Sequence, residues 1–239
     1  PDAVDGCAAI RRILVDNHET RKRQRGHIRR TISIYRSLVD AGILEFLDEP
    51  DEHGRRVRVT FDLQDEFALH QPLSLWALQA TIELAEREGS DQTPTDTLQP
   101  TAPPVSNEVT HALDVLTVIE AVQEDPGVVI AAQVNEAKSL LMSEMKSAGV
   151  EYEERMERLA QVENPKPNKD WIYSSFNRFR SRHPWVGGDT VRPKSVARDL
   201  YERSMTFGEY VNHYGLKRSE GVVLRYLSDV YKGLVQNVA

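Results

Sequence analysis

Cations and aromatic rings are the side chains in this sequence whose types and spacing point to chemistry. Seven Arg and Lys residues lie between positions 21 and 36, with no acidic residue among them. A second basic group, between positions 178 and 203, is interleaved with Trp185 and Tyr201. Because cations bind phosphates and aromatic rings stack on bases, these mixtures are the ingredients of a channel for single-stranded nucleic acid.

Both basic groups also have a plain structural interpretation, and the residues alone leave the choice open. The run at 21–36 can be a solvated helix face or a seam that docks on an acidic domain. Trp185 can cover the end of a helical bundle, with the arginines around it as ordinary surface charges. Nothing in either group indicates sequence-specific reading of bases.

Motifs for catalysis and metal binding are missing from the sequence. It has no phosphate-binding loop, no carboxylate run that would hold magnesium for ATP, and no dinucleotide-binding glycine motif. The histidines lack the spacing of a zinc site, and the single cysteine, Cys7, excludes an internal disulfide and a cysteine-based zinc site. We therefore expect no catalytic residue, metal or cofactor in this chain, and no ATP hydrolysis by it alone.

Composition indicates a globular protein that stays out of the membrane. The 239 residues are 40% hydrophobic and 28% charged, and the net charge is -7. No apolar run approaches the roughly 20 residues that span a bilayer. We expect a cytoplasmic protein with no membrane partner. The first residue is Pro1 and not Met, so we expect a fragment of a longer polypeptide.

The first 66 residues predict a winged-helix domain. Helical spacing of Ile28, Ile32 and Tyr35 predicts a buried stripe on a helix over 21–39, which Gly42 would end. A short strand at 43–47, an acidic turn, and alternation at 57–61 predict a hairpin that forms the wing.

Residues 67–239 predict a multi-helix bundle, so the expected fold class is mainly α with a small β-hairpin. Asp125 and Asp170 are placed to cap two of its helices, and Pro193 to start a third. The Pro- and Thr-rich stretch at 89–106 predicts a mobile insertion. Helical periodicity before position 206 recurs at 73–88, 107–124, 126–148, 150–162, 171–183 and 193–205.

The last segment, 206–236, reads as two helices joined by a tight turn at 214–216. Arg225 lies one turn before Asp229, which fits either a partly buried ion pair or a cation presented to a charged polymer. The stretch SEGVVLRYL at 219–227 resembles the "EG-x-x-x-R" helix in the C-terminal region of superkiller-like DExH RNA helicases. The run at 205–234 is most similar to the bacterial, chiefly actinobacterial, branch of DEAD/DEAH-box helicases.

The resemblance implies a non-catalytic accessory region. In that family a winged helix and a helical bundle follow two RecA-like motor domains, which bind ATP and Mg²⁺ and are absent here. The implied partners are these motor domains of the same polypeptide and single-stranded nucleic acid, RNA rather than DNA. Trp185 is the candidate for base stacking, and the candidates for phosphate contact are Arg225, Lys217, Arg218, Arg29, Arg30, Arg25 and Arg198.

Two other classes of function remain open. The chain can be a protein-docking module, with its basic helix as an intramolecular or partner interface. A winged-helix transcription regulator fits less well, because it would bind duplex DNA as a two-fold dimer and no dimerisation helix stands out.

Overall fold

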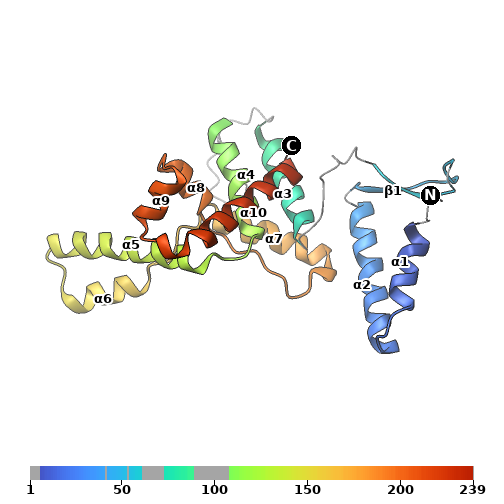
Figure 1. Cartoon of the computed structure of the whole chain (residues 1–239), viewed down its shortest axis with the longest axis horizontal. Coiled ribbons are helices and arrows are strands. Elements are labelled where there is room, and N and C mark those ends of the chain that lie inside the picture. Colours follow the sequence, from blue (N-terminus) through green and yellow to red (C-terminus); the bar gives the residue numbers. More distant parts are fainter. Residues whose placement is uncertain (1–5, 41, 53, 61–72, 89–107, 239) are drawn as a thin grey trace. The chain divides into compact units, whose positions relative to one another are not determined.

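The computed structural model describes residues 6–40, 42–52, 54–60, 73–88 and 108–238. Within these ranges the regular structure consists of ten α-helices, two short 3₁₀ helices and one two-stranded antiparallel sheet (Figure 1). The expected fold class, mainly α with a small β-hairpin, is confirmed. No helix of this described part has the length and apolar character needed to cross a membrane. The predicted insertion at 89–106 lies outside the described residues.

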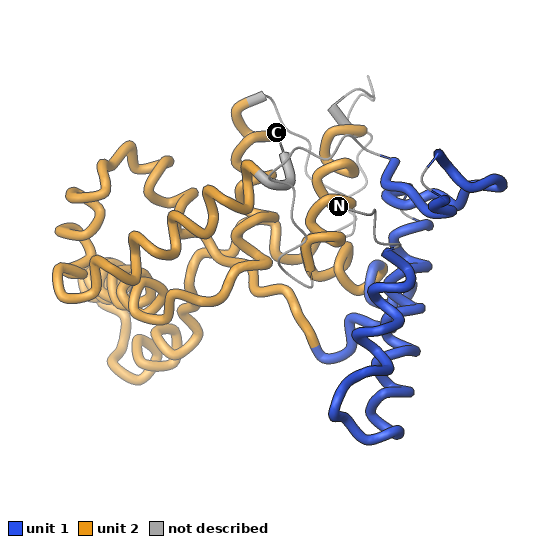
Figure 2. Tube along the Cα trace, turned by 45° about the vertical axis from the view of Figure 1, so that its right-hand side comes forward, with its two compact units in different colours: residues 1–67, 179–188 blue, residues 68–178, 189–239 orange. Residues whose placement is uncertain are grey.

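The chain divides into two compact units, and Figure 2 colours them separately. Unit 1 holds residues 1–67 and, far along the chain, residues 179–188. Unit 2 holds residues 68–178 and 189–239. No pattern in the sequence indicated that 179–188 belongs with the first unit.

Unit 1 places a two-stranded hairpin beside two helices, with α2 in contact with α1, β1 and η1. The Cα register pairs Leu44 with Val59 and Phe46 with Val57. Its elements are α1 (Gly6–Val15), α2 (Arg21–Asp40), β1 (Leu44–Phe46), β2 (Val57–Val59) and η1 (Pro184–Val186).

Unit 2 is a bundle in which α3, α4 and α10 pack on one another, α8 packs on α4, and α6 runs beside α5 (Figure 1). Trp76 of α3 lies in its core with 1% of its surface exposed, and its ring meets Phe176 edge to face. Residues 179–182, the last turn of α7, belong to unit 1. The helices are α3 (Ser74–Glu88), α4 (Glu108–Val122), α5 (Gly127–Ser147), α6 (Tyr152–Ala160), α7 (Lys169–Arg182), α8 (Ala197–Glu202), α9 (Phe207–His213), η2 (Lys217–Ser219) and α10 (Glu220–Val238).

Three expected helix starts are wrong. Helix α5 begins at Gly127 after Pro126 with no side-chain cap, because Asp125 instead binds the buried Lys194 ammonium at 3.0 Å. Helix α7 begins at Lys169, so Asp170 lies within its first turn. Residues 193–196 are buried and non-helical, and α8 begins only at Ala197.

Candidate nucleic-acid interface

Helix α2 presents most of its surface to solvent because only one narrow face is packed. Of its residues Ser37 alone is buried. Ile28 and Tyr35 are half-buried, whereas Ile32, expected in the buried stripe, is 46% exposed. The helix ends as predicted: Gly42 has a φ of +70°, and the Ile43 N–H donates to the Leu38 carbonyl at 2.9 Å.

The cations of α2 have almost no carboxylate partners. In the described part of the chain only Arg23 forms an ion pair, with Glu19 at 3.2 Å, and both side chains are well exposed. The single acidic residue of the helix is Asp40, at its last position. An acid-free surface of this length sets up a positive potential that attracts polyanions. The exposed basic residues are Arg21, Lys22, Arg23, Arg25, Arg29, Arg30 and Arg36.

A second exposed basic surface lies in unit 2, where η2 leads into α10. The side chains of Lys217 and Arg218 are exposed, and that of Arg225 is 82% exposed. Arg225 lies 3.7 Å from Asp229, which lies at the same distance from Lys232. Ion pairs at this exposure contribute little to stability, so these cations remain available to an anionic ligand. The interpretation of Arg225 as a partly buried member of an ion pair is therefore wrong.

Arg198 differs from these cations because its guanidinium is enclosed by the fold. Its side chain is 13% exposed and lies 3.0 Å from the buried Asp114 carboxylate. Its Nε also donates to Glu202 at 2.8 Å, and Nη1 donates to Thr117 at 3.0 Å. A phosphate would have to displace these partners, so the geometry gives Arg198 a role in joining α8 to α4.

Trp185 belongs to unit 1, where it helps to hold the segment 179–188. Its indole N–H donates to the Ser37 hydroxyl at 2.7 Å, and the His183 Nδ1 lies 2.7 Å from the same oxygen. The ring also meets Phe179 edge to face. Burial lowers the pKa of His183, against the opposing charge of Asp40. Trp185 therefore uses its polar edge within unit 1, and the residue is half-buried.

A buried polar network joins α4, α8 and α10, and no sequence pattern predicted it. Glu120 has no exposed surface, and its Oε1 accepts the Val196 and Ala197 N–H groups and the Tyr226 hydroxyl at 2.8 to 2.9 Å. Burial raises the pKa of Glu120, although these donors lower it. Lys194 is equally buried and donates to the Gln123 carbonyl at 2.8 Å. Their partners lie up to 106 residues away, which explains why no local pattern predicts them.

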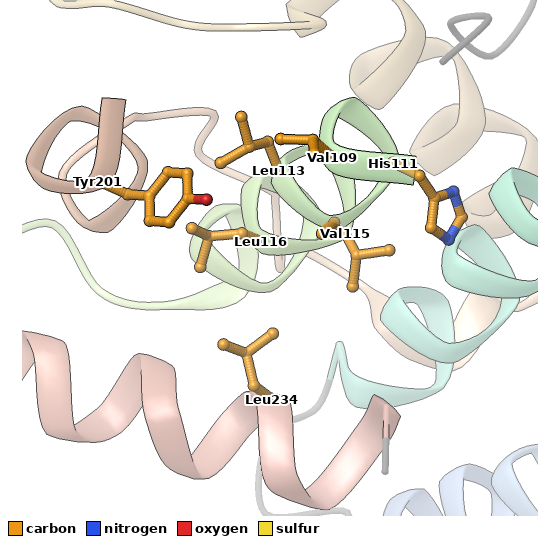
Figure 3. Close-up of a pocket in the computed structure, with 8 residues that line it drawn as sticks. Val109, His111, Leu113, Val115, Leu116, Tyr201 and Leu234 are labelled. Atoms are coloured by element: carbon orange, nitrogen blue, oxygen red, sulfur yellow. The ribbon is translucent and has the colours of Figure 1, made fainter. Parts of the chain in front are cut away.

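An apolar cavity of about 580 Å³ lies among α4, α8 and α10 of unit 2. Figure 3 shows Leu116 of α4 facing it from one side, Leu234 of α10 from below, and the Tyr201 ring from α8. No Lys, Arg, Asp or Glu lines it. The cavity therefore offers no Lys or Arg side chain to a phosphate.

The described residues contain no cluster of three His, Cys, Asp or Glu side chains that could hold a metal ion. Six of the candidate residues are exposed, and they lie on two segments, one in each unit. Arg25, Arg29 and Arg30 lie on α2, whereas Lys217 and Arg218 lie in η2 and Arg225 in the α10 helix that follows it; Arg198 and Trp185 belong to neither group.

The fold and these surfaces define a mainly helical protein with a basic exposed helix. A family model for a domain of unknown function, DUF3516, matches residues 2–239, and the chain belongs to this family. Neither a search of curated proteins nor a search of solved structures found a match.

Proposed function

We propose that this chain is a non-catalytic accessory region of an ATP-dependent helicase of the superkiller-like type, which guides single-stranded nucleic acid. The observation that carries the proposal is the exposed face of α2, with seven cations and one exposed ion pair. Single strands are held by positive surfaces that track the sugar-phosphate backbone. The strand class is RNA rather than DNA, and the site of action is the cytoplasm.

The two basic surfaces contribute in the same way, through phosphates. Arg25, Arg29 and Arg30 on α2 and Arg225 on α10 carry charges that no buried carboxylate of the described residues neutralises. Contacts of this kind fix position and supply affinity, but they read no sequence. The expected binding is therefore sequence-independent and weakens as salt rises, because bound cations release counterions from the strand.

ATP and Mg²⁺ belong, in this proposal, to RecA-like motor domains of the parent polypeptide. The chain has no phosphate-binding loop, and its described residues hold no metal-binding cluster. Its own contribution is to bind and orient the strand that the motor moves, and to support the motor domains.

The second candidate function is protein docking, and α1 favours it. This helix has no buried residue, and its Ile10, Ile13 and Val15 are 49%, 72% and 49% exposed. Exposed aliphatic side chains flanked by Arg11 and Arg12 fit a partner with an apolar patch and an acidic rim.

Binding of the 239-residue chain to labelled single-stranded RNA, single-stranded DNA and duplex DNA at two salt concentrations tests the proposal. We expect micromolar or tighter binding to single strands, with a salt slope that corresponds to about three to six phosphates. The triple variant Arg25→Gln, Arg29→Gln, Arg30→Gln should lose most of this binding and keep its helical content. Absence of single-strand binding by the unmodified chain would favour docking, and tight duplex preference would favour a regulator.

A further inference from the structure

Gly26 lies inside helix α2, where a glycine is unfavourable and where no packing contact within the described part of the chain requires one. Glycine in a helix interior costs stability relative to alanine because its backbone is freer in the unfolded chain. A glycine is required where the backbone needs a positive φ or where another group packs close. Gly26 has helical backbone, and apart from its chain neighbours and the backbone of its own helix no atom of the described residues lies within 4 Å of the position that a Cβ would occupy. Its surface is exposed.

The neighbours of Gly26 on the helix surface are all cations. In an α-helix the residues three and four positions away lie on the same face as a given residue. For Gly26 these are Lys22 and Arg23 on one side, and Arg29 and Arg30 on the other. Each is exposed, and only Arg23 has a carboxylate partner in the described part of the chain.

This arrangement makes a basic cradle: a bare patch of helix backbone with a cation at each corner. The rise of an α-helix separates Lys22 from Arg30 by about 12 Å, enough for a short run of phosphates. A Cβ at position 26 would stand between the four side chains and hold a ligand away from the backbone. Glycine is the residue that permits close approach of a ligand to a backbone.

We propose that this basic cradle, Lys22, Arg23, Gly26, Arg29 and Arg30, seats the phosphodiester backbone of single-stranded nucleic acid directly on α2. The inference rests on the proposed function and deepens it, because it names the contact surface and gives Gly26 a role. The guanidinium and ammonium groups bind phosphate oxygens from both sides of position 26, and the absence of a side chain at Gly26 leaves the helix backbone accessible to the strand. Non-specific electrostatic attraction of the strand to α2 would need only the positive charges. Direct contact between the strand and the helix backbone also needs the glycine.

Gly26→Leu distinguishes non-specific attraction from direct contact, because it covers the helix backbone at position 26 and leaves every charge in place. Leucine is a good helix former and cannot hydrogen-bond a phosphate, so the helix is retained or strengthened. Gly208→Leu is the matched control, since Gly208 is also an exposed helical glycine whose Cβ position meets no packing neighbour of the described residues within 4 Å, and the residues three and four positions on in α9, Val211 and Asn212, are uncharged. Gly26→Ala supplies an intermediate size.

Fluorescence anisotropy with a labelled oligouridine, on the full chain over a salt series, measures the effect. Gly26→Leu should weaken binding by at least about threefold and lower the salt slope by about 1, with a smaller effect from Gly26→Ala and none from Gly208→Leu. Circular dichroism and thermal melting should show both Gly26 variants at least as helical and as stable as the unmodified chain.

Unchanged affinity and salt slope in a folded Gly26→Leu chain would overturn the cradle and leave the proposed function standing on diffuse charge. An unmodified chain that binds poly-glutamate but no oligonucleotide would overturn the proposed function, and the cradle with it. Equal losses in Gly26→Leu and Gly208→Leu would assign the effect to helix stiffness and would also overturn the cradle.

Discussion

Helix α2 and the interior of unit 2 carry the same kinds of charged side chain in opposite settings. On α2 the cations are exposed, and one weak ion pair engages Arg23. In unit 2, Lys194 and Glu120 have no exposed surface, and several backbone groups satisfy each of them. A buried charge must find partners within the protein, whereas an exposed one keeps its water until a ligand displaces it.

The comparison teaches that a basic residue next to an aromatic one in sequence is weak evidence of function. Arg198 and Trp185 belong to the basic and aromatic group at 178–203, yet both direct their polar atoms into the protein. The α2 arginines stand out because only Arg23, which pairs with Glu19, has a carboxylate partner among the described residues. For these residues the absence of acids between positions 20 and 39 is the informative signal.

The largest difference in the free energy of unfolding is expected between the replacement of an enclosed arginine and that of an exposed arginine. Arg198→Ala should lower the free energy of unfolding by about 3 kcal/mol, because it strips the buried Asp114 of its cationic partner. Arg225→Ala should change it by less than about 0.5 kcal/mol, since that side chain is 82% exposed. Urea unfolding of both variants measures the difference, and similar losses would contradict the distinction.

Two glycines offer the next test, because one is packed and one is bare. A Cβ on Gly233 of α10 would lie 2.8 Å from the Ile119 Cγ2 atom and 3.0 Å from the Gln123 Nε2 atom. Gly233→Ala should therefore destabilise unit 2 by about 1–3 kcal/mol through overpacking. Gly26→Ala on α2 should stabilise by roughly 0.5–1 kcal/mol. Thermal melting of the two variants gives the sign of each change, and a loss in both would be evidence against a bare α2 surface.

A substitution in the first turn of α2 should have a smaller effect, and it should raise stability while it weakens binding. Positive charges lie at Arg21, Lys22 and Arg23, where the helix dipole favours negative ones, and the turn has no acidic residue. Lys22→Glu should raise the free energy of unfolding by about 0.3–1 kcal/mol and weaken single-strand binding. Lys22→Gln, with half the charge change, should fall between. A stabilised variant that binds as well as the unmodified chain would remove Lys22 from the interface.

The smallest expected effect depends on pH and acts within unit 1. Because the pKa of His183 is lowered in the fold, its contribution to stability is complete above the unfolded value of about 6.5 and is lost as pH falls through the lower folded value. Asp40 opposes this shift and Arg182 adds to it. The Trp185 fluorescence, obtained as the difference from a Trp185→Phe chain, should change over this acid range. Replacement of His183 by Asn should abolish the change, and its persistence would assign the titration to another group.

Local signals in the sequence predicted α2, its end at Gly42, and the turn at 214–216 before α10. These features depend on side-chain period and on single residues that accept a positive φ, which neighbouring residues reveal. The starts of α5 and α8 could not be predicted in this way. Asp125 serves Lys194 instead of its own helix, and Glu120 of α4 supplies the acceptor at the start of α8. Such contacts join distant parts of the chain.

The candidate site likewise has features that neighbouring residues in the sequence predict and features that only the folded chain shows. The sequence sufficed to place Arg25, Arg29 and Arg30 on a helix segment without acidic residues, whereas it left open whether Arg225 is partly buried or, as in the structure, exposed. It could not reveal that Gly26 lacks any packing neighbour, because an empty space around a Cβ is a property of the folded chain.

The discontinuity of unit 1 has a consequence for synthesis on the ribosome. The Ser37 hydroxyl that holds His183 and Trp185 is made 146 residues before the first of them. Chains emerge at roughly 5–20 residues per second, so the N-terminal part of unit 1 waits several seconds or more for its last segment. During that interval α2 exposes its basic surface while the contacts around Ser37 are still missing. Completion of unit 1 therefore comes long after the synthesis of its first segment.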